Sequence, residues 1–221
     1  MTMRDKRVAA NEPTEIVAAS QNEHKIAELS AILEEYGYVV VSRSAVGASD
    51  FDVDEDGDSF EANSLKKALA TMRATGKPAV ADDSGLETDF LSGAPGVYSA
   101  RFAGVVGKTA DYENNRKLLR LLEGAPNEKR KGRFVSVVTL VFPDGSVFSA
   151  RGECEGSIGT EARGAGGFGY DPLFTPEGYK ETFAQLPASV KNRISHRAKA
   201  LGKLKEMLEG AEALKVPPVS R

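Results

Sequence analysis

Val80–Phe102 reads VADDSGLETDFLSGAPGVYSARF. Its small apolar start, together with Ala79, predicts a short strand that ends where the run Asp82-Asp83-Ser84-Gly85 begins a turn. Proteins of the α/β class place their chemistry at the ends of strands, so this junction is the first candidate site. Because successive strand side chains point to opposite faces, Asp82 and Asp83 should diverge, one toward a cleft and the other toward its support.

Two interpretations are open for these carboxylates. A carboxylate beside Ser84 and Gly85 can ligate a hard cation such as Mg²⁺, or accept a proton from a water held near that cation. Alternatively, the run is a turn with a helix cap, since Asp, Ser and Gly dominate turns. The long irregular continuation Gly93–Phe102 favours a functional role, because a purely structural turn does not need it.

The composition restricts the class of protein. The 221 residues suit one domain or two closely joined lobes, and the net charge of -3, with dispersed Lys and Arg, argues against a nucleic-acid polymer as partner. Cys154 is the only cysteine, which excludes an intrachain disulfide and a thiolate zinc cluster, and we expect it to be a small buried strand residue. No run approaches the ~20 apolar residues of a membrane span, and residues 1–13 are polar, so we expect a cytoplasmic protein with a flexible N-terminus.

The first predicted strand, Glu15–Ala19, leads into a helix whose apolar residues recur at helical spacing over 26–36. Ser20 with Glu23 three residues later predicts a capping box. The N-terminus of this helix should attract an anion, and Asn22 and Lys25 in its first turn could reach a phosphate oxygen. An ordinary capped helix with a solvated Lys25 is the alternative.

A second strand is predicted at Tyr38–Ser42, followed by the acidic run Asp50–Asp58 and a helix over 59–72. We expect the apolar residues of this helix to be buried: Leu65, Ala68, Leu69 and Met72. Asn63 and Lys67 should then share the exposed face and invite a polar ligand. Most of the acidic run is expected to be a solvated loop, but one of its carboxylates could complete a metal site with Asp83.

The middle of the chain is predicted to be mainly architectural. A third helix is predicted over Thr109–Glu123, and one of its faces carries Tyr112, Asn115, Leu119 and Leu122. Residues 133–142 and 146–150 predict a β-hairpin around Pro143-Asp144-Gly145. The glycine-rich stretch 159–174 differs, because its backbone could approach a ligand closely and Phe168 and Tyr170 could stack on a base. It does not fit a dinucleotide fingerprint, since no helix follows the glycines.

Ser195 is predicted to cap the last helix, which continues through Leu208. This places His196 and Arg197 in the first turn, where positive charge is unfavourable, and so favours a role in reading a ligand. An ordinary surface imidazole is the alternative for His196. The tail beyond Gly210, residues 211–221, is expected to be loose.

Four of these segments, in this order, resemble the inosine triphosphate pyrophosphatase family, the dITP/XTP pyrophosphatases that remove non-standard purine nucleoside triphosphates. They are Ser20–Lys25, residues 81–102, Gly166–Phe174 and Ser195–Arg197, and the resemblance extends from about Glu15 to Leu208. It implies an α/β fold with a central twisted mixed sheet, flanking helices and two lobes around a substrate cleft, over residues 14–210. It also implies a homodimer and Mg²⁺-dependent hydrolysis of a nucleoside triphosphate to the monophosphate and pyrophosphate.

The resemblance also implies a role for individual residues. Asp83 matches the proton acceptor and a metal ligand, Glu55 matches the second metal ligand, and Ser84 matches a substrate contact. The positions that hold the triphosphate are matched by Ser20, Gln21, Asn22, Glu23, His24, Lys25 and Lys67. Those that hold the base and sugar are matched by Phe168, Gly169, Tyr170, Asp171, Lys191, His196 and Arg197.

One departure from the family is visible, since Gln21 stands where a glycine is frequent, and the backbone approach to phosphate there should differ. Two other functions stay open at this point. One is a related house-cleaning pyrophosphatase for modified pyrimidine or methylated nucleotides. The other is a regulatory module that binds a nucleotide without turnover.

Overall fold

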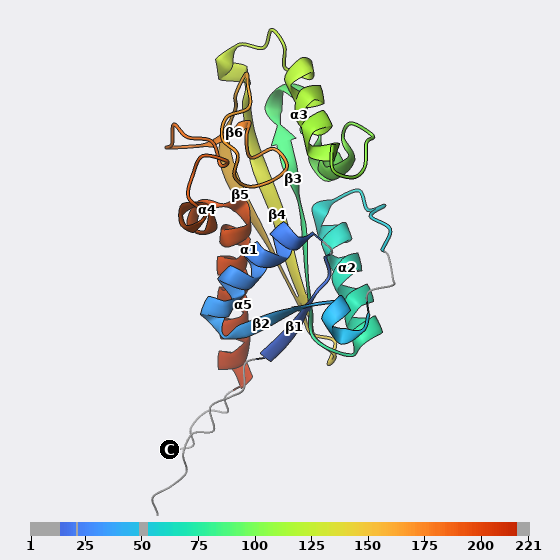
Figure 1. Ribbon diagram of the computed structural model, residues 1–221. Helices are drawn as coiled ribbons and strands as arrows, with labels where there is room; N and C mark the ends of the chain where they lie inside the picture. The colour runs from blue at the N-terminus through green and yellow to red at the C-terminus, as the bar shows by residue number, and fades with distance from the viewer. Residues whose placement is uncertain (1–13, 21, 49–52, 216–221) are drawn as a thin grey trace, which may run out of the picture.

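One six-stranded sheet runs through the computed structural model, which describes residues 14–20, 22–48 and 53–215. The strand order is β2-β1-β3-β4-β5-β6, with β2, β1 and β3 parallel and β3 to β6 antiparallel. The strands are β1 (Thr14–Ala18), β2 (Tyr38–Ser42), β3 (Ala79–Thr88), β4 (Lys131–Val141), β5 (Val147–Ile158) and β6 (Phe174–Pro176). The long strands β3, β4 and β5 connect a half with β1 and β2 to a half with β6 (Figure 1).

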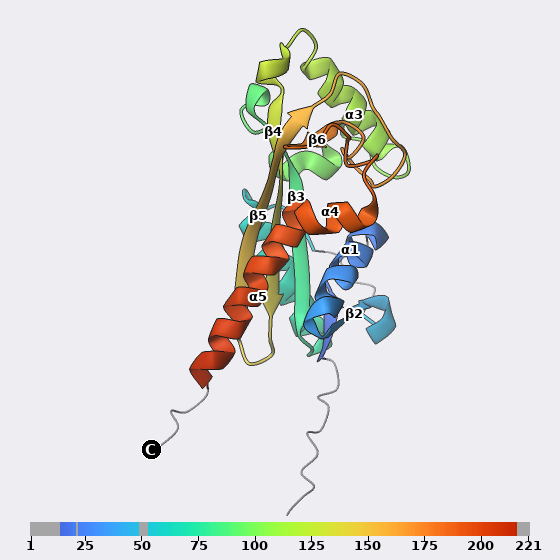
Figure 2. The same ribbon diagram turned by 90° about the vertical axis from the view of Figure 1, so that its left-hand side faces the viewer.

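Helices cover both faces of the sheet (Figures 1 and 2). They are α1 (Glu23–Leu33), α2 (Phe60–Thr75), α3 (Ala110–Leu121), α4 (Ala188–Ile194) and α5 (His196–Lys215). α1 and α5 pack on one face, where Leu29 and Leu201 join a core with Val80 of β3. α2 packs on the other, where Ala68 meets Ala81. This arrangement confirms the predicted α/β fold with a mixed sheet and flanking helices.

A separate apolar cluster fills the half of the molecule that carries β6 and α3. Leu118 of α3 and Phe174 of β6 pack there with Leu86 of β3 and Phe134 of β4. The rings of Phe134 and Phe174 lie 4.7 Å apart in an edge-to-face arrangement, which aromatic pairs favour. Each half therefore has its own core, and the cleft described below lies where they meet.

β3 does not end at Asp82, contrary to the prediction, but continues to Thr88. Residues 82–85 pair with the antiparallel strand β4, with Asp82 opposite Val138 and Gly85 opposite Val135, so their backbone groups are bonded in the sheet. The glycine is required for packing, because a Cβ at Gly85 would lie 2.4 Å from Ser99 Oγ. The irregular continuation thus folds back directly onto β3.

α1 is capped by Asn22, so the capping box predicted for Ser20 and Glu23 is wrong. Asn22 Oδ1 accepts hydrogen bonds from the backbone N–H groups of His24 (3.0 Å) and Lys25 (3.2 Å). Glu23 is the first helical residue and is too close to the cap for a box, which needs a carboxylate at the third helical position. Ser20 Oγ instead accepts from the Asn22 N–H at 3.1 Å.

The sheet-facing side of α2 is polar, and the predicted faces of this helix are partly wrong. Asn63 and Lys67 are buried, at 1% and 7% exposure, whereas Leu65 is 37% exposed. Ala68 is buried as predicted, and Leu69 and Met72 are partly buried. The reason is tertiary: the inner side of α2 borders the carboxylate of Asp83 in β3, so polar side chains find a partner there.

The residues predicted to share one face of α3 differ in burial. Leu122, just after the helix, is buried, but Tyr112 is 64% exposed, and Asn114 and Leu118 are buried instead. Asn114 Nδ2 donates to the carbonyl oxygens of Ser99 (3.3 Å) and Ala100 (3.1 Å), and its Oδ1 accepts from the Ala103 N–H at 2.7 Å. Hydrogen bonds between Asn114 and residues 99–103, and not apolar periodicity alone, therefore determine which side of α3 faces inward.

The predicted hairpin is confirmed as β4 and β5, although β5 extends to Ile158. Cys154 lies in β5 at 4% exposure, and burial raises the pKa of its thiol to about 11, as expected for a structural cysteine. Ser195 caps α5 as predicted, with Oγ accepting from the Ala198 N–H at 3.2 Å.

α5 continues to Lys215 rather than ending near Gly210, so the predicted loose tail begins too early. The predictions for residues 1–13 and for the last residues, 216–221, lie outside the described residues. Within the described residues, no helix has the length and apolar character needed to cross a membrane.

Candidate active site

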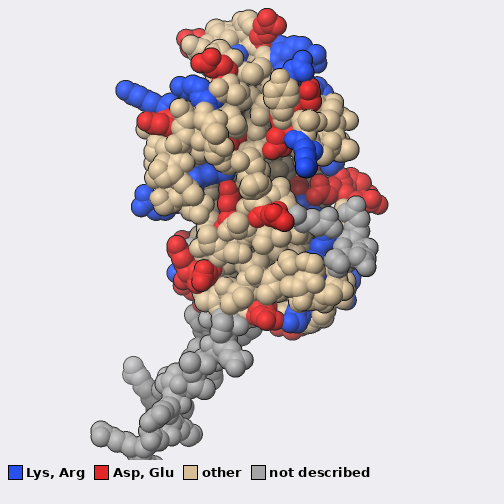
Figure 3. Space-filling view, in the orientation of Figure 1, with Lys and Arg blue, Asp and Glu red and all other residues tan. Residues whose placement is uncertain are grey.

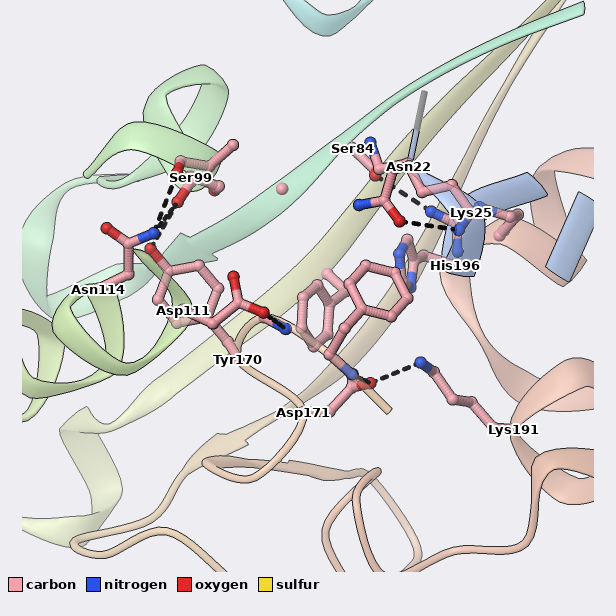
Figure 4. A pocket seen from close by; sticks show the side chains of 16 residues that line it. Asn22, Lys25, Ser84, Ser99, Asp111, Asn114, Tyr170, Asp171, Lys191 and His196 are labelled. Carbon is pink, nitrogen blue, oxygen red and sulfur yellow. Dashed lines mark hydrogen bonds and ion pairs between the residues drawn. The ribbon is translucent and has the colours of Figure 1, made fainter. Parts of the chain in front are cut away.

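A cleft at the meeting point of the two halves contains two adjoining compartments. Both are lined by Asn22, Lys25, Ser84 and Ala100, which form the junction between them. We call the first the aromatic compartment; its lining includes Phe168, Tyr170, Asp171, Lys191, His196 and Arg197 (Figure 4). We call the second the carboxylate compartment; its lining includes Ser20, Arg43, Glu55, Lys67, Asp82 and Asp83. In Figure 3 the molecular surface is hollowed between the halves, with acidic and basic side chains nearby.

The alternation of β3 distributes adjacent residues over opposite faces of the sheet. Asp82 points to the α5 face, where it meets Arg197, and Asp83 points to the α2 face, where it meets Lys67. The predicted divergence of the two carboxylates is therefore confirmed. Ser84 returns to the face of Asp82, and its Oγ donates to Asp82 Oδ2 at 2.9 Å.

Asp82 is a buried anion held by several donors. Its Oδ2 lies 2.9 Å from Arg197 Nη2 and 3.1 Å from Lys25 Nζ, and its Oδ1 accepts from Ser136 Oγ. Burial alone would raise its pKa, but Arg197 and Lys25 outweigh this effect and place the pKa of Asp82 well below its ordinary value. Asp82 is thus charged and fully engaged, which suits the supporting role.

Asp83 lies in the carboxylate compartment with Glu55, and Lys67 contacts both. Lys67 Nζ is 2.6 Å from Asp83 Oδ1 and 2.9 Å from Glu55 Oε1, while Asn63 Nδ2 donates to Asp83 Oδ2 at 3.3 Å. Burial raises the pKa of Asp83 despite the opposing effect of Lys67. For Glu55, burial acts upward, but Lys67 more than offsets it and the pKa is lowered. The two carboxylates therefore differ in basicity, as an acid–base site requires.

The donor set of this compartment fits Mg²⁺. Asp83 and Glu55 converge on one cationic group, Lys67 Nζ, and so define a small region where a cation is stabilised. Mg²⁺ is commonly bound by one or two carboxylates and completes its shell with water and substrate phosphates. No cluster of three or more acidic, His or Cys side chains that could hold a metal occurs within the described residues. Asp83 and Glu55, which contact the same ammonium group, are the candidate protein ligands.

The aromatic compartment has a planar wall and buried polar atoms. His196 is 4% exposed and its ring stacks on Phe134 with a centroid distance of 4.8 Å, which rules out an ordinary surface imidazole. His196 Nδ1 and Arg197 Nε are buried and have no hydrogen-bond partner among the described residues. Buried polar atoms are normally paired, so these two atoms mark positions where a bound ligand would supply partners.

The glycine-rich segment closes this compartment through a fixed hydrogen-bond network. Asp171 Oδ2 accepts from the Phe168 N–H at 2.9 Å and from Lys191 Nζ at 2.6 Å. Lys191 Nζ also lies 4.8 Å from the centre of the Phe168 ring and 2.8 Å from Glu28 Oε1. Burial raises the pKa of Asp171, although Lys191 acts in the opposite direction. The predicted base-binding residues are thus brought together.

Residues of α3 hold the same segment from the other side. Asp111 Oδ2 accepts from the Gly169 N–H at 2.7 Å, and Asn115 Nδ2 donates to the Gly169 carbonyl at 2.9 Å. Tyr170 donates to the carbonyl of Ser99 at 2.8 Å. Asp111 and Asn114 line the aromatic compartment but were not predicted, because single polar residues on a helix give no signal of their own.

The first predicted motif is only partly assembled in the cleft. Ser20, Asn22 and Lys25 line it, Gln21 is outside the described residues, and Glu23 and His24 line neither compartment. The exposed ring of His24 instead stacks on Phe168, with centroids 5.5 Å apart. Glu28, whose carboxylate contacts Lys191 and Arg197, was not predicted either. It lies three residues after Lys25 on the same face of α1, so helical spacing could have identified it.

The buried His196 predicts a pH dependence of stability. Burial, reinforced by Arg197, lowers the pKa of His196 well below its ordinary value, whereas in the unfolded chain it titrates near 6.5. Below about pH 6.5 the unfolded chain binds one more proton than the folded chain. His196 should therefore lower the free energy of unfolding by about 1.4 kcal/mol for each unit by which the pH falls. Urea unfolding between about pH 5 and pH 7 should show this slope in the wild type and not in His196→Gln. If the free energy of unfolding varies with pH in the same way in both proteins, the assignment is contradicted. The difference between the two curves isolates the contribution of His196 from that of the carboxylates with shifted pKa values.

The cleft of this α/β fold joins the aromatic compartment to the carboxylate compartment with its lysines. This combination is typical of proteins that bind a small ligand with a flat part and a strongly anionic part. The Ham1 family matches residues 16–207 of the chain, and the chain belongs to that family.

Similar proteins cover nearly the whole chain. A dITP/XTP pyrophosphatase from Desulforamulus reducens is 51% identical over 193 residues, which are 87% of this chain and 94% of the relative. The solved structure of the Staphylococcus aureus Ham1 protein is 40% identical, with a TM-score of 0.77 over 90% of this chain and all of that one. That of a nucleoside-triphosphatase / dITP/XTP pyrophosphatase from Mycobacterium abscessus is 43% identical, with a TM-score of 0.69 over 86% of this chain and 98% of that one.

Proposed function

We propose that this protein hydrolyses non-standard purine nucleoside triphosphates (dITP, ITP and XTP) to the nucleoside monophosphate and pyrophosphate, with Mg²⁺ as cofactor. The observation that carries the proposal is the pair of compartments that meet at Lys25 and Ser84. The names of the relatives, dITP/XTP pyrophosphatase, support the same activity.

In this proposal the base occupies the aromatic compartment and the phosphates occupy the carboxylate compartment. Phe168 offers the base a face for stacking, and Lys191 beside it adds positive charge. Lys25 at the junction and Lys67 beyond it are the cations that meet the phosphates. The sugar and the α-phosphate then lie at the junction, close to Asp83.

Asp83 acts as the base that accepts a proton from the attacking water. Its raised pKa, caused mainly by burial, makes it a stronger proton acceptor than an exposed aspartate. The water oxygen bonds to the α-phosphorus, the bond from that phosphorus to the bridging oxygen breaks, and pyrophosphate leaves. Lys67 and Lys25 stabilise the charge on the phosphates. Mg²⁺ held by Asp83 and Glu55 would neutralise further phosphate charge.

Discrimination against adenine follows from hydrogen-bond polarity. A 6-keto purine presents an acceptor at O6 and a donor at N1, whereas adenine presents the reverse. Arg197 Nε is a buried donor without a partner in the part of the chain that the structure describes, and it suits O6, while the buried carboxylate of Asp171 suits N1–H. Sites that would leave such groups unpaired can reject a wrong ligand by roughly 10⁴-fold.

A pyrophosphate-release assay on a panel of triphosphates, with and without Mg²⁺, tests the proposal. We expect the highest kcat/KM for dITP, ITP or XTP and little activity without the metal. A modified pyrimidine or methylated nucleotide as best substrate would contradict the specificity, and binding without release would indicate a regulatory module. The homodimer implied by the resemblance stays a prediction, which light scattering would measure.

Phe168→Ala is expected to weaken base binding more than phosphate binding. Loss of a stacked ring costs about 1–3 kcal/mol of base binding, so kcat/KM for dITP should fall about 10- to 100-fold. Affinity for inorganic tripolyphosphate, measured by calorimetry, should change little. Equal losses for both ligands would contradict the assigned position of the base.

His24→Ala is the matched control for Phe168, because it removes the ring that stacks on Phe168 and His24 lines neither compartment. If Phe168 itself contacts the base, this control should have a much smaller effect on kcat/KM for dITP than Phe168→Ala has.

A further inference from the structure

The ends of the parallel strands β1 and β2 place an additional arginine beside the predicted phosphate-binding segment. The last registered pair of these strands is Ala18 with Ser42, so the chain continues from both at the same edge of the sheet. β1 leads into the segment that begins at Ser20, and β2 leads into Arg43. Ligands of open α/β sheets bind at the carboxyl ends of parallel strands, so Arg43 enters the region where a ligand is expected.

Arg43 lines the carboxylate compartment but not the aromatic one. It shares that lining with Ser20, Lys25 and Lys67, and it is 7% exposed. Its backbone is fixed, because the Arg43 carbonyl accepts hydrogen bonds from the N–H groups of Val46 (3.2 Å) and Ala48 (2.9 Å). The guanidinium is therefore carried by an anchored turn rather than by a free loop.

The charges of this compartment create a need for such a residue. Lys67 contacts the carboxylates of Asp83 and Glu55, and Lys25 contacts that of Asp82. A nucleoside triphosphate brings several negative charges to the same place, and these two lysines already serve three carboxylates. Arg43 is the third basic side chain of the lining, and a guanidinium matches phosphate oxygens through two parallel hydrogen bonds.

We propose that Arg43 binds the β- and γ-phosphates of the substrate, which become the leaving pyrophosphate. The distal phosphates are assigned because Arg43 lies outside the junction residues shared with the aromatic compartment, whereas the sugar and α-phosphate belong at that junction. This inference rests on the proposed function and adds a substrate contact that the resemblance did not imply.

Calorimetric titration with inorganic tripolyphosphate and with dIMP, each in the presence of Mg²⁺, tests the inference without requiring turnover. Arg43→Ala should weaken tripolyphosphate binding about tenfold or more, as expected for loss of a charged hydrogen-bond donor, and change dIMP binding less than about twofold. Arg43→Lys should recover part of the loss, because a lysine keeps the charge without the paired donors.

Arg120→Ala is the matched control, since it removes one positive charge from an exposed position on α3. Tripolyphosphate binding by Arg43→Ala that equals that of this control would overturn the inference, as would an equal loss of dIMP binding. Arg43→Gln, of similar length and without charge, replaces the alanine variant if that variant does not fold. A wild-type protein that binds tripolyphosphate through Arg43 but releases no pyrophosphate from dITP would contradict the proposed function and leave this inference standing.

Discussion

Asp83→Asn is expected to lower the rate of pyrophosphate release from dITP by about 10³-fold, within the range of general-base catalysis. The amide keeps the shape of the side chain and can still accept from Lys67, which lies 2.6 Å from Asp83 Oδ1. It accepts no proton at neutral pH and is a poorer ligand for a hard cation. The measurement is kcat for pyrophosphate release at saturating dITP with Mg²⁺.

Asp56→Asn is the matched control for this prediction, because Asp56 belongs to the same acidic run as Glu55 but pairs with Lys66 at the surface. Its activity should stay close to that of the wild type. An Asp83→Asn protein that retains more than about a tenth of the wild-type kcat would exclude Asp83 as the base.

Arg197→Ala is expected to lower the free energy of unfolding by about 3–5 kcal/mol, the usual cost of leaving a buried charge without its partner. Arg197 is 1% exposed and its Nη2 lies 2.9 Å from Asp82 Oδ2, and Asp82 is itself 2% exposed. Urea unfolding at neutral pH measures the change. Because Arg197→Ala destabilises the fold, its activity does not measure base binding alone. Phe168→Ala tests base binding more directly.

The double variant Asp82→Asn/Arg197→Ala separates the buried charge from lost packing. Arg197→Ala leaves the buried Asp82 with Lys25 as its remaining cation, and neutralising Asp82 removes that under-compensated charge, so the double variant should be more stable than the single one. If both unfold at the same urea concentration, or if Arg197→Ala costs less than about 1 kcal/mol, the pair behaves as a surface salt bridge and the assignment is wrong.

The ion pair of Asp82 and Arg197 also explains how basic residues can occupy the first turn of α5. His196 and Arg197 begin α5, where the helix dipole disfavours positive charge. In the fold, burial keeps His196 neutral by lowering its pKa, and Arg197 meets the carboxylates of Asp82 and Glu28. The local cost is thus offset by residues of β3 and α1, which no local pattern could indicate.

Local sequence was sufficient for features that depend on a few neighbouring residues. The strands β1 and β2, the β4–β5 hairpin and the Ser195 cap follow from apolar runs, turn residues and capping preferences, which act over a short range. The opposite directions of Asp82 and Asp83 also follow from sequence, because alternation is a property of any strand. The candidate residues could be predicted because they stand in contiguous segments.

The tertiary structure decided which polar groups are buried and what they contact. Asn63 and Lys67 face inward because β3 offers them the carboxylate of Asp83, and β3 continues past its turn-like residues because β4 completes its hydrogen bonds. Arg43 reaches the cleft only because β2 pairs beside β1. Burial and ion pairing join residues that are distant in sequence, so no periodicity within one segment records them. That is the physical reason why the sequence indicated candidate residues of the cleft but not the partners that hold them in place.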